Sequence, residues 1–470
     1  MKNFFLISLL SVISLYGNQT PDVTPVLVNQ PLPFKLTIQL ADFKLPLGIH
    51  SAASGRCGDE YLFITGRTNG LHNFSSTIPN NNFPPNKQNT CVFVINFKER
   101  SVRTRSLHDP KSGLNQEQID FLSVTSAQSY QRKDTLYITG GYGINTRTQA
   151  FSTKPVLTAI DVPGLIHWVT HPESCDVASK YIRQIFNEVF QVTGGSMVQV
   201  GDNPTLLMMG QNFSGYYTPS SNGNYTQQIR RFKIIDDGKK LDVKIYQATP
   251  QDSNYRRRDL NIVPIIEIKD QKKVASLVAL SGVFTPGEDA GIWTVPIEIT
   301  ANGQPSMANP NLPDTFKQAM NNYYSANAEF LSDNGDMYIA LFGGITYGHF
   351  KDDMFLTSES FPFTNQVTIV KRSKDGIYEQ YFVKTTYPKI LSNGSNLGNE
   401  LLFGVGAKFL IKQGIPVYSN GVINLAKIRK KTVIGYIVGG IQSTLPDTDS
   451  PSDSAASPYI FEVILTPNFC

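Results

Sequence analysis

Six short apolar segments, each ending in glycine, recur along the chain at intervals of 61 to 96 residues. These intervals are much shorter than a typical domain, so the pattern predicts one supersecondary unit repeated along the chain. A unit of this size buries its apolar face only by packing against its neighbours, which favours a repeat architecture. The segments end at Gly66, Gly140, Gly210, Gly282, Gly343 and Gly439.

Each repeat has the pattern of four strands separated by turns. In the first repeat, strands are expected within 50–57, 61–66, 91–97 and 102–107, with a Gly58-Asp59 turn between the first two. The composition agrees with a β-rich protein, because 21 Tyr, 28 Phe, 36 Gly and 28 Pro accompany only 17% charged residues. The sequence therefore predicts an all-β fold, a six-bladed β-propeller with four-stranded antiparallel blades.

The last repeat is one strand short. Its predicted strands lie within 407–411, 433–440 and 459–465, and the chain ends soon afterwards. Residues 33–43 have a strand pattern and precede the first full repeat. We expect this N-terminal strand to complete the last blade and close the ring, because the pairing would cover an exposed sheet edge. The propeller is thus expected to span residues 33–470.

The first 17 residues have the pattern of a signal peptide. Lys2 precedes an apolar stretch at 4–16 that is too short for a permanent membrane span, and polar, Pro-rich sequence follows at 18–32. We expect export to the periplasm, the cell surface or the medium, with 18–32 as a linker. No later run reaches the length of a transmembrane helix, so no integral membrane segment is expected.

Three of the apolar segments end in a glycine pair before a long loop, at 140–141, 343–344 and 439–440. This arrangement resembles the kelch repeats of the galactose-oxidase-like propeller superfamily. The resemblance covers about 33–467, although only Trp168 and Trp293 are present and the aromatic residues that usually follow the pair are not evident. It implies a divergent kelch-like propeller, a fold that serves protein-binding modules, carbohydrate-active enzymes and oxidases.

Long loops are expected on one face of the propeller only, since the connections after the glycines are long and the other turns within repeats are tight. A binding surface is predicted on that face. An amphipathic helix is expected at 175–190 and a second short helix at 315–323. The long loops run over 67–89, 142–153, 211–227, 283–290, 345–365 and 441–458.

The candidate ligand-binding residues lie where these loops approach the axis. Arg256, Arg257 and Arg258 precede the first strand of the fourth repeat, where an arginine fork would hold a carboxylate, sulfate or phosphate. A solvated basic loop, partly neutralised by Asp259, is the alternative. Four further candidates follow the glycines of separate repeats and combine hydrogen-bonding with aromatic groups: Arg67, Tyr142, Gln211 and Tyr347.

Four cysteines in an exported chain predict two disulfides. Cys57 and Cys470 are assigned to the face with short turns, whereas Cys91 and Cys175 are assigned to the face with long loops. We therefore expect the pairs Cys57 with Cys470 and Cys91 with Cys175.

The net charge of +4 is small for 470 residues, and the basic clusters are scattered, so nucleic acid is not an expected partner. No nucleophile elbow, phosphate-binding loop or zinc-protease motif is present, and neither a metal nor a cofactor is indicated. The favoured function is a monomeric, exported binding protein for a glycan or a protein, without catalysis. The alternative is a carbohydrate-active enzyme, an isomerase or lyase, that acts on an acidic sugar at the channel mouth.

Overall fold

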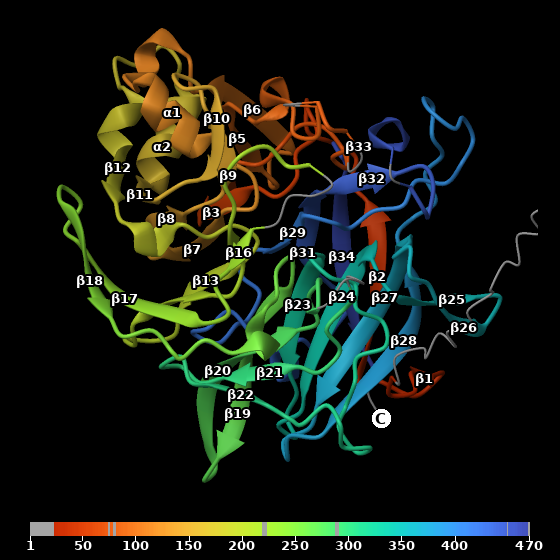
Figure 1. Ribbon diagram of the computed structural model, residues 1–470. Helices are drawn as coiled ribbons and strands as arrows, with labels where there is room; N and C mark the ends of the chain where they lie inside the picture. Colours follow the sequence, from red (N-terminus) through yellow and green to blue (C-terminus); the bar gives the residue numbers. More distant parts are fainter. Residues whose placement is uncertain are drawn as a thin grey trace, which may run out of the picture.

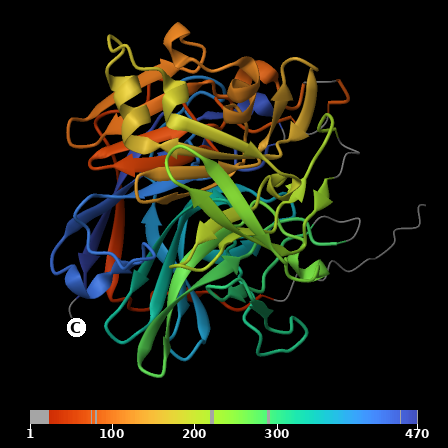
Figure 2. The same ribbon diagram turned by 90° about the vertical axis from the view of Figure 1, so that its left-hand side faces the viewer.

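The computed structural model describes residues 23–73, 76–78, 81–218, 223–286, 291–448 and 450–468. The predicted signal peptide at 1–17 lies outside these residues. The described chain forms a β-propeller in which large sheets lie side by side, with two short helices grouped at one side of the molecule (Figures 1 and 2). Within the described chain, no helix has the length and hydropathy that a membrane span requires.

Six large sheets follow one another along the sequence, and each contains the strands of one repeat. The first sheet is β3 (Ala53–Cys57), β4 (Glu60–Ile64), β5 (Cys91–Asn96) and β6 (Ser101–Ser106). The second is β7 (Gln128–Arg132), β8 (Thr135–Thr139), β11 (Val156–Asp161) and β12 (Ile182–Phe186). The third is β13 (Ser196–Gln199), β14 (Thr205–Met208), β17 (Ile229–Asp236) and β18 (Leu241–Tyr246). The fourth is β19 (Asn261–Lys269), β20 (Lys272–Leu280), β21 (Ile297–Ile299) and β22 (Pro305–Met307).

The fifth sheet differs from the prediction because it has six strands. Its middle strands are β23 (Ala326–Leu331), β24 (Met337–Ile345), β27 (Phe363–Arg372) and β28 (Tyr378–Thr386). Two short segments add to its edges in parallel, β1 (Leu27–Val28) on β28 and β30 (Ile423–Asn424) on β23. The described chain thus contains five four-stranded blades where six are predicted.

The sixth sheet combines three strands from the end of the described chain with one strand from near its start. It contains β29 (Ala407–Ile411), β31 (Thr432–Gly439), β34 (Ile460–Pro467) and β2 (Phe34–Leu40). Strand β2 pairs antiparallel with β34, from Phe34 opposite Pro467 to Leu40 opposite Phe461. The backbone N–H of Asn468 also donates to the carbonyl of Pro33 at 2.9 Å.

The hydrophobic core lies in layers between neighbouring sheets. Leu36 of the sixth sheet packs with Phe330 of the fifth, and Tyr436 of the sixth packs with Phe93 of the first. Four more buried clusters join the first sheet to the second, the second to the third, the third to the fourth and the fourth to the fifth. Each large sheet is therefore covered on both faces, as in a propeller.

One face of the propeller carries the long loops that follow the glycines. We call it the loop face, and the opposite face, with turns such as 58–59 and 133–134, the turn face. The prediction that only the loop face is elaborated is wrong, because two long connections, 162–181 with helix α2 (Val162–Thr170) and 412–431, join strands at the turn face. Four of the loops form two-stranded hairpins of their own. These hairpins are β9 (Tyr142–Asn145) with β10 (Ala150–Thr153), β15 (Gln211–Asn212) with β16 (Asn224–Tyr225), β25 (Gly348–Lys351) with β26 (Met354–Thr357), and β32 (Ile441–Ser443) with β33 (Ser454–Ala456).

The repeated glycines have a common physical cause. All six that end the apolar segments have a positive φ, between 60° and 111°. At Gly140 an added Cβ would also lie 1.9 Å from the carbonyl oxygen of Val192, in the segment that leads into the next repeat. The glycine pattern therefore marks places where a strand end turns sharply against a neighbouring backbone.

Replacing Gly140 by alanine is expected to lower the free energy of unfolding by about 3 kcal/mol, because strain at positive φ adds to the clash with Val192. Gly201 provides a matched control, since its φ is 58° but nothing lies within 4 Å of an added Cβ. Gly201→Ala is expected to cost only about 1 kcal/mol. Urea unfolding of both variants measures the difference, and equal losses would contradict the close approach.

The helices lie elsewhere than predicted. Helix α2 (Val162–Thr170) joins β11 to β12, and the side chain of Asp161 caps its start. The four-strand pattern predicts the fourth strand of the second repeat within 164–170, so this prediction is wrong. The predicted helix at 175–190 is wrong, because this segment contains β12 between two short 3-10 turns, Ala178–Tyr181 and Glu188–Phe190. Residues 315–323 form no helix either, whereas α1 (Gln116–Leu122) is not anticipated by the sequence pattern.

Cys57, Cys91 and Cys175 are free thiols in the structure. The predicted pair of Cys91 with Cys175 is therefore wrong. Cys91 packs on the face of the first sheet that contacts the sixth, whereas the segment after α2 that carries Cys175 packs on the second-sheet side. The predicted partner of Cys57, Cys470, lies outside the described residues.

Candidate functional site

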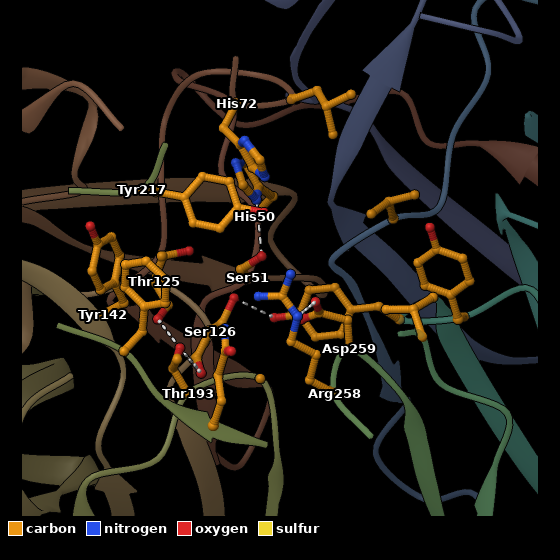
Figure 3. A pocket seen from close by; sticks show the side chains of 18 of the residues that line it. His50, Ser51, His72, Thr125, Ser126, Tyr142, Thr193, Tyr217, Arg258 and Asp259 are labelled. Atoms are coloured by element: carbon orange, nitrogen blue, oxygen red, sulfur yellow. Dashed lines mark hydrogen bonds and ion pairs between the residues drawn. The ribbon is translucent and has the colours of Figure 1, made fainter. Parts of the chain in front are cut away.

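A cavity of about 180 Å³ lies on the loop face, where the inner strands of all six large sheets begin. We call the first strand of each repeat its inner strand; the six inner strands are β3, β7, β13, β19, β23 and β29. Figure 3 shows side chains from separate repeats converging on the cavity. The residues that precede the inner strands form the floor of the cavity, and the long loops form its walls. The floor residues are His50, Ser51, Thr125, Ser126, Thr193, Gly194, Arg258, Asp259, Tyr323, Tyr324 and Val405.

At the bottom of the cavity lies a ring of six residues at equivalent positions, one or two residues before the inner strands, and five of them are floor residues. All six have left-handed backbone conformations with φ between 50° and 68°. Backbone hydrogen bonds connect Ser51 to Gly406, Gly406 to Tyr324, Gly194 to Ser126 and Asp259 to Gly194. We call this ring the neck; its members are Ser51, Ser126, Gly194, Asp259, Tyr324 and Gly406.

Tyr324 is the unusual member of the neck, because a bulky side chain rarely adopts its φ of 52°. Its hydroxyl lies 3.5 Å from Oγ of Ser126, and burial raises its pKa. Such strain persists where the surroundings hold the residue in place, and it often accompanies a functional site.

Arg258 and Asp259 bring opposite charges to the cavity. Nε of Arg258 lies 3.6 Å from Oδ2 of Asp259, and the guanidinium lies 4.4 Å from the ring centroid of Phe284. Nε is buried and has no hydrogen-bond partner among the described residues. Burial opposes the charge of Arg258, but Asp259 outweighs this effect and raises the arginine's pKa, so the guanidinium stays charged. Burial also raises the pKa of Asp259, although Arg258 acts against it.

Two histidines, the buried His50 and the half-buried His72, lie on the same side of the cavity (Figure 3). Nδ1 of His50 lies 3.0 Å from Oγ of Ser51, and burial, with a smaller effect from Arg67, lowers the pKa of His50 to about 3. Burial likewise lowers the pKa of His72 to about 4, and its ring stacks on Phe83 with centroids 4.5 Å apart. Both imidazoles are therefore neutral near pH 7.

The lowered pKa of His50 predicts a pH dependence of stability. In the unfolded chain its pKa is about 6.5, so below that pH the unfolded state binds a proton that the folded state excludes. The stabilisation is complete above pH 6.5 and is lost as the pH falls towards 3. In urea unfolding between pH 7 and 5, His50→Asn is expected to reduce the slope against pH by about 1 kcal/mol per unit. Identical slopes for variant and wild type would contradict a buried neutral His50.

Aromatic side chains form an apolar wall beside the histidines. The ring centroids of Tyr142 and Phe213 are 5.4 Å apart, and those of Phe83 and Tyr217 are also 5.4 Å apart. The hydroxyl of Tyr142 donates to the carbonyl of Gly215 at 2.8 Å, which fixes its ring. The site thus combines an apolar wall with polar groups at the floor, as small-molecule sites do.

Three of the seven residues predicted as ligand-binding line the cavity: Tyr142, Gln211 and Arg258. Tyr142 and Gln211 begin the hairpins β9–β10 and β15–β16, so the loops after the glycines do reach the axis.

The other four do not line it. Arg67 is buried at 2% exposure and donates to the carbonyl of Pro84. Arg256 donates to the carbonyl of Phe284, and Tyr347 is buried at 2% exposure. Arg257 is fully buried and donates to the carbonyls of Asn254 and Ser281. These side chains make internal contacts that hold loops in place.

Five residues that line the cavity are not among the ligand-binding residues predicted from the sequence: His50, His72, Asp259, Tyr323 and Tyr324. The useful signal is positional, because Arg258 and Asp259 occupy the two places that His50 and Ser51, or Tyr323 and Tyr324, occupy in other repeats. Aligning the residues that precede each inner strand reveals His50, Asp259, Tyr323 and Tyr324. His72 lies in a long loop that has no equivalent position in the other repeats, so the alignment does not reveal it. Among the described residues, no group of three or more His, Cys, Asp or Glu side chains is arranged to hold a metal ion.

Comparisons with known proteins leave the family open. No protein-family model matches the chain, and no curated protein matches its sequence. A solved structure described as "Structure of YjhT" has 9% sequence identity, with an alignment that covers 90% of this chain and 98% of the other and a TM-score of 0.42. A TM-score this low adds no argument about the site.

Proposed function

We propose that this protein is an exported β-propeller that binds an acidic carbohydrate unit in the cavity on its loop face. The shape of the cavity supports a glycan over a folded protein partner, because about 180 Å³ of space at the axis accommodates a small ligand group. Aromatic rings such as Tyr142 offer flat apolar surface to a sugar ring, and the Ser, Thr and Tyr hydroxyls offer hydrogen bonds to its hydroxyl groups.

The observation that carries the proposal is the state of Arg258. Its charged guanidinium is largely withdrawn from water, yet the buried Nε has no hydrogen-bond partner and Asp259 lies at 3.6 Å. Asp259 meets the guanidinium only at this long distance, so a ligand acceptor that contacts the side of the guanidinium facing the cavity gains a charge-assisted hydrogen bond. A carboxylate on a sugar provides such an acceptor.

The finer architecture belongs to the same proposal. We infer that the middle strands of the fifth sheet are the remaining blade of a six-bladed, kelch-like ring, and that β2 closes this ring. The glycine pairs, the six buried clusters between sheets and the hydrogen bond from Ser51 to Gly406 support this inference. Export is proposed from the signal-peptide pattern at 1–17.

Calorimetric titration with galacturonate and galactose, beside a glycan array, tests the proposal. We expect the protein to bind galacturonate more tightly than galactose and to retain acidic glycans on the array. Equal affinity for the two sugars, or no retention of any glycan, would overturn it.

The alternative is a carbohydrate-active enzyme of the isomerase or lyase type. One observation favours it: the imidazoles of His50 and His72 both line the cavity, and histidine is the side chain that most often acts as a general acid or base. Proton NMR of acidic sugars incubated with the protein separates the two readings. An altered anomeric equilibration rate or a new product identifies an enzyme, whereas binding without either identifies a binding protein.

A further inference from the structure

A second cavity of about 300 Å³ lies on the axis beyond the neck. It shares Ser126, Gly194 and Tyr324 with the cavity on the loop face, so the two spaces meet at the neck. We call it the lower cavity. Its walls come from the inner strands β7, β13, β19, β23 and β29.

The lining of the lower cavity is polar and carries one kind of charge. Hydroxyl and amide side chains dominate it, and no acidic side chain occurs among its lining residues. Lys408 on β29 is the single charged residue of this lining. The polar side chains are those of Ser126, Gln128, Ser129, Tyr130, Ser196, Asn261, Tyr324, Ser325 and Asn327.

Lys408 has no protein partner for its charge within the described part of the chain. No hydrogen bond or ion pair of its ammonium occurs there, and burial lowers its pKa with no acidic group opposing the effect. Its neighbours Ala407 and Phe409 pack into the core between the fifth and sixth sheets, which places Lys408 on the opposite face of β29. Glu329 on β23 makes no ion pair with it, and burial raises the pKa of Glu329 to about 8, so that carboxyl is mostly neutral near pH 7.

We propose that the lower cavity is a binding site for a small oxyanion, with Lys408 as its charged ligand-binding residue. The cavity holds a positive charge without a counter-ion, so an anion that enters it gains an attraction that no lining carboxylate offsets. The hydroxyl groups of Ser129 and Ser196, which also line the cavity, supply donors for the remaining oxygens. This site is separate from Arg258 and does not depend on the proposed function.

Calorimetric titration of the full chain with inorganic phosphate tests this site. We expect Lys408→Gln to weaken phosphate binding by about tenfold or more, and Lys408→Arg to retain it, because the charge is preserved. Lys412→Gln is the matched control, since Lys412 follows β29 directly but is exposed. Arg258→Leu is expected to leave this phosphate affinity unchanged, which separates the site from the upper cavity.

Three results would overturn the proposal: no phosphate binding by the wild type, equal affinity in wild type and Lys408→Gln, or a loss with Arg258→Leu instead. If Lys408→Gln does not fold, Lys408→Arg still provides a test with thermal unfolding. Phosphate is expected to raise the Tm of wild type and Lys408→Arg alike. A shift that chloride reproduces at equal ionic strength would indicate general screening and contradict the site.

Discussion

Arg258→Leu is expected to weaken galacturonate binding by about 100-fold. The substitution removes the charged donor that faces the cavity, and a hydrogen bond to a charged group contributes about 1.5–3 kcal/mol. Leucine also leaves Asp259 in the cavity without its partner at 3.6 Å, so the carboxylate of the ligand would meet a negative charge. Calorimetric titration with galacturonate measures the effect.

Two controls make this result specific to the guanidinium. Binding of galactose, which has no carboxylate, is expected to change by less than about threefold. Arg147→Leu removes an exposed arginine from the β9–β10 turn on the same face and is expected to have no effect. Equal losses with Arg258→Leu for both sugars would show that the arginine supports the fold of the site and does not hold the carboxylate.

Arg257→Met is expected to destabilise the protein by about 4 kcal/mol, although Arg257 is the direct neighbour of Arg258 in the sequence. The Arg257 side chain is fully buried and donates to the carbonyls of Asn254 and Ser281, and its guanidinium lies 4.6 Å from the ring centroid of Trp293. Methionine fills much of the same volume but leaves the buried carbonyl of Ser281 without its donor, at about 1–3 kcal/mol, and also removes the hydrogen bond to Asn254 and the contact with Trp293. Urea unfolding measures the loss.

The comparison variant is Arg132→Met, which changes an exposed arginine at the end of β7 and is expected to stay within about 0.5 kcal/mol of wild type. Below its unfolding transition, Arg257→Met is expected to bind galacturonate like wild type. Near-wild-type stability together with lost binding would instead assign Arg257 to the site.

Arg257 and Arg258 show how much of the site the sequence can predict. The Arg256–Arg258 cluster is found from the sequence, and so is its place before an inner strand. Which arginine points into the cavity depends on the left-handed residue Asp259 and on the packing of Trp293, neither of which a local pattern reveals. The candidates after the glycines divide in the same way, because Tyr142 lines the cavity whereas Tyr347 is buried and does not line it.

The strands are predictable because apolar alternation and glycine mark them, and helix α2 shows the limit of that signal. Its sequence, VPGLIHWVT, is apolar enough for a buried strand or a helix, and periodicity alone does not distinguish the two. The deciding local signals are Asp161 as N-cap and Pro163 in the first turn. Once α2 takes this segment, the fourth strand of the repeat moves to Ile182–Phe186, where a helix is predicted.

The pairing of β2 with β34 also determines which face of the propeller would point outward if the protein were tethered to a surface or to another domain. Pro33 and Asn468 are hydrogen-bonded neighbours at the end of the sixth sheet that lies on the turn face. A tether fused after Asn468 would therefore leave from the side opposite the cavity mouth, and the mouth would point away from whatever holds that end.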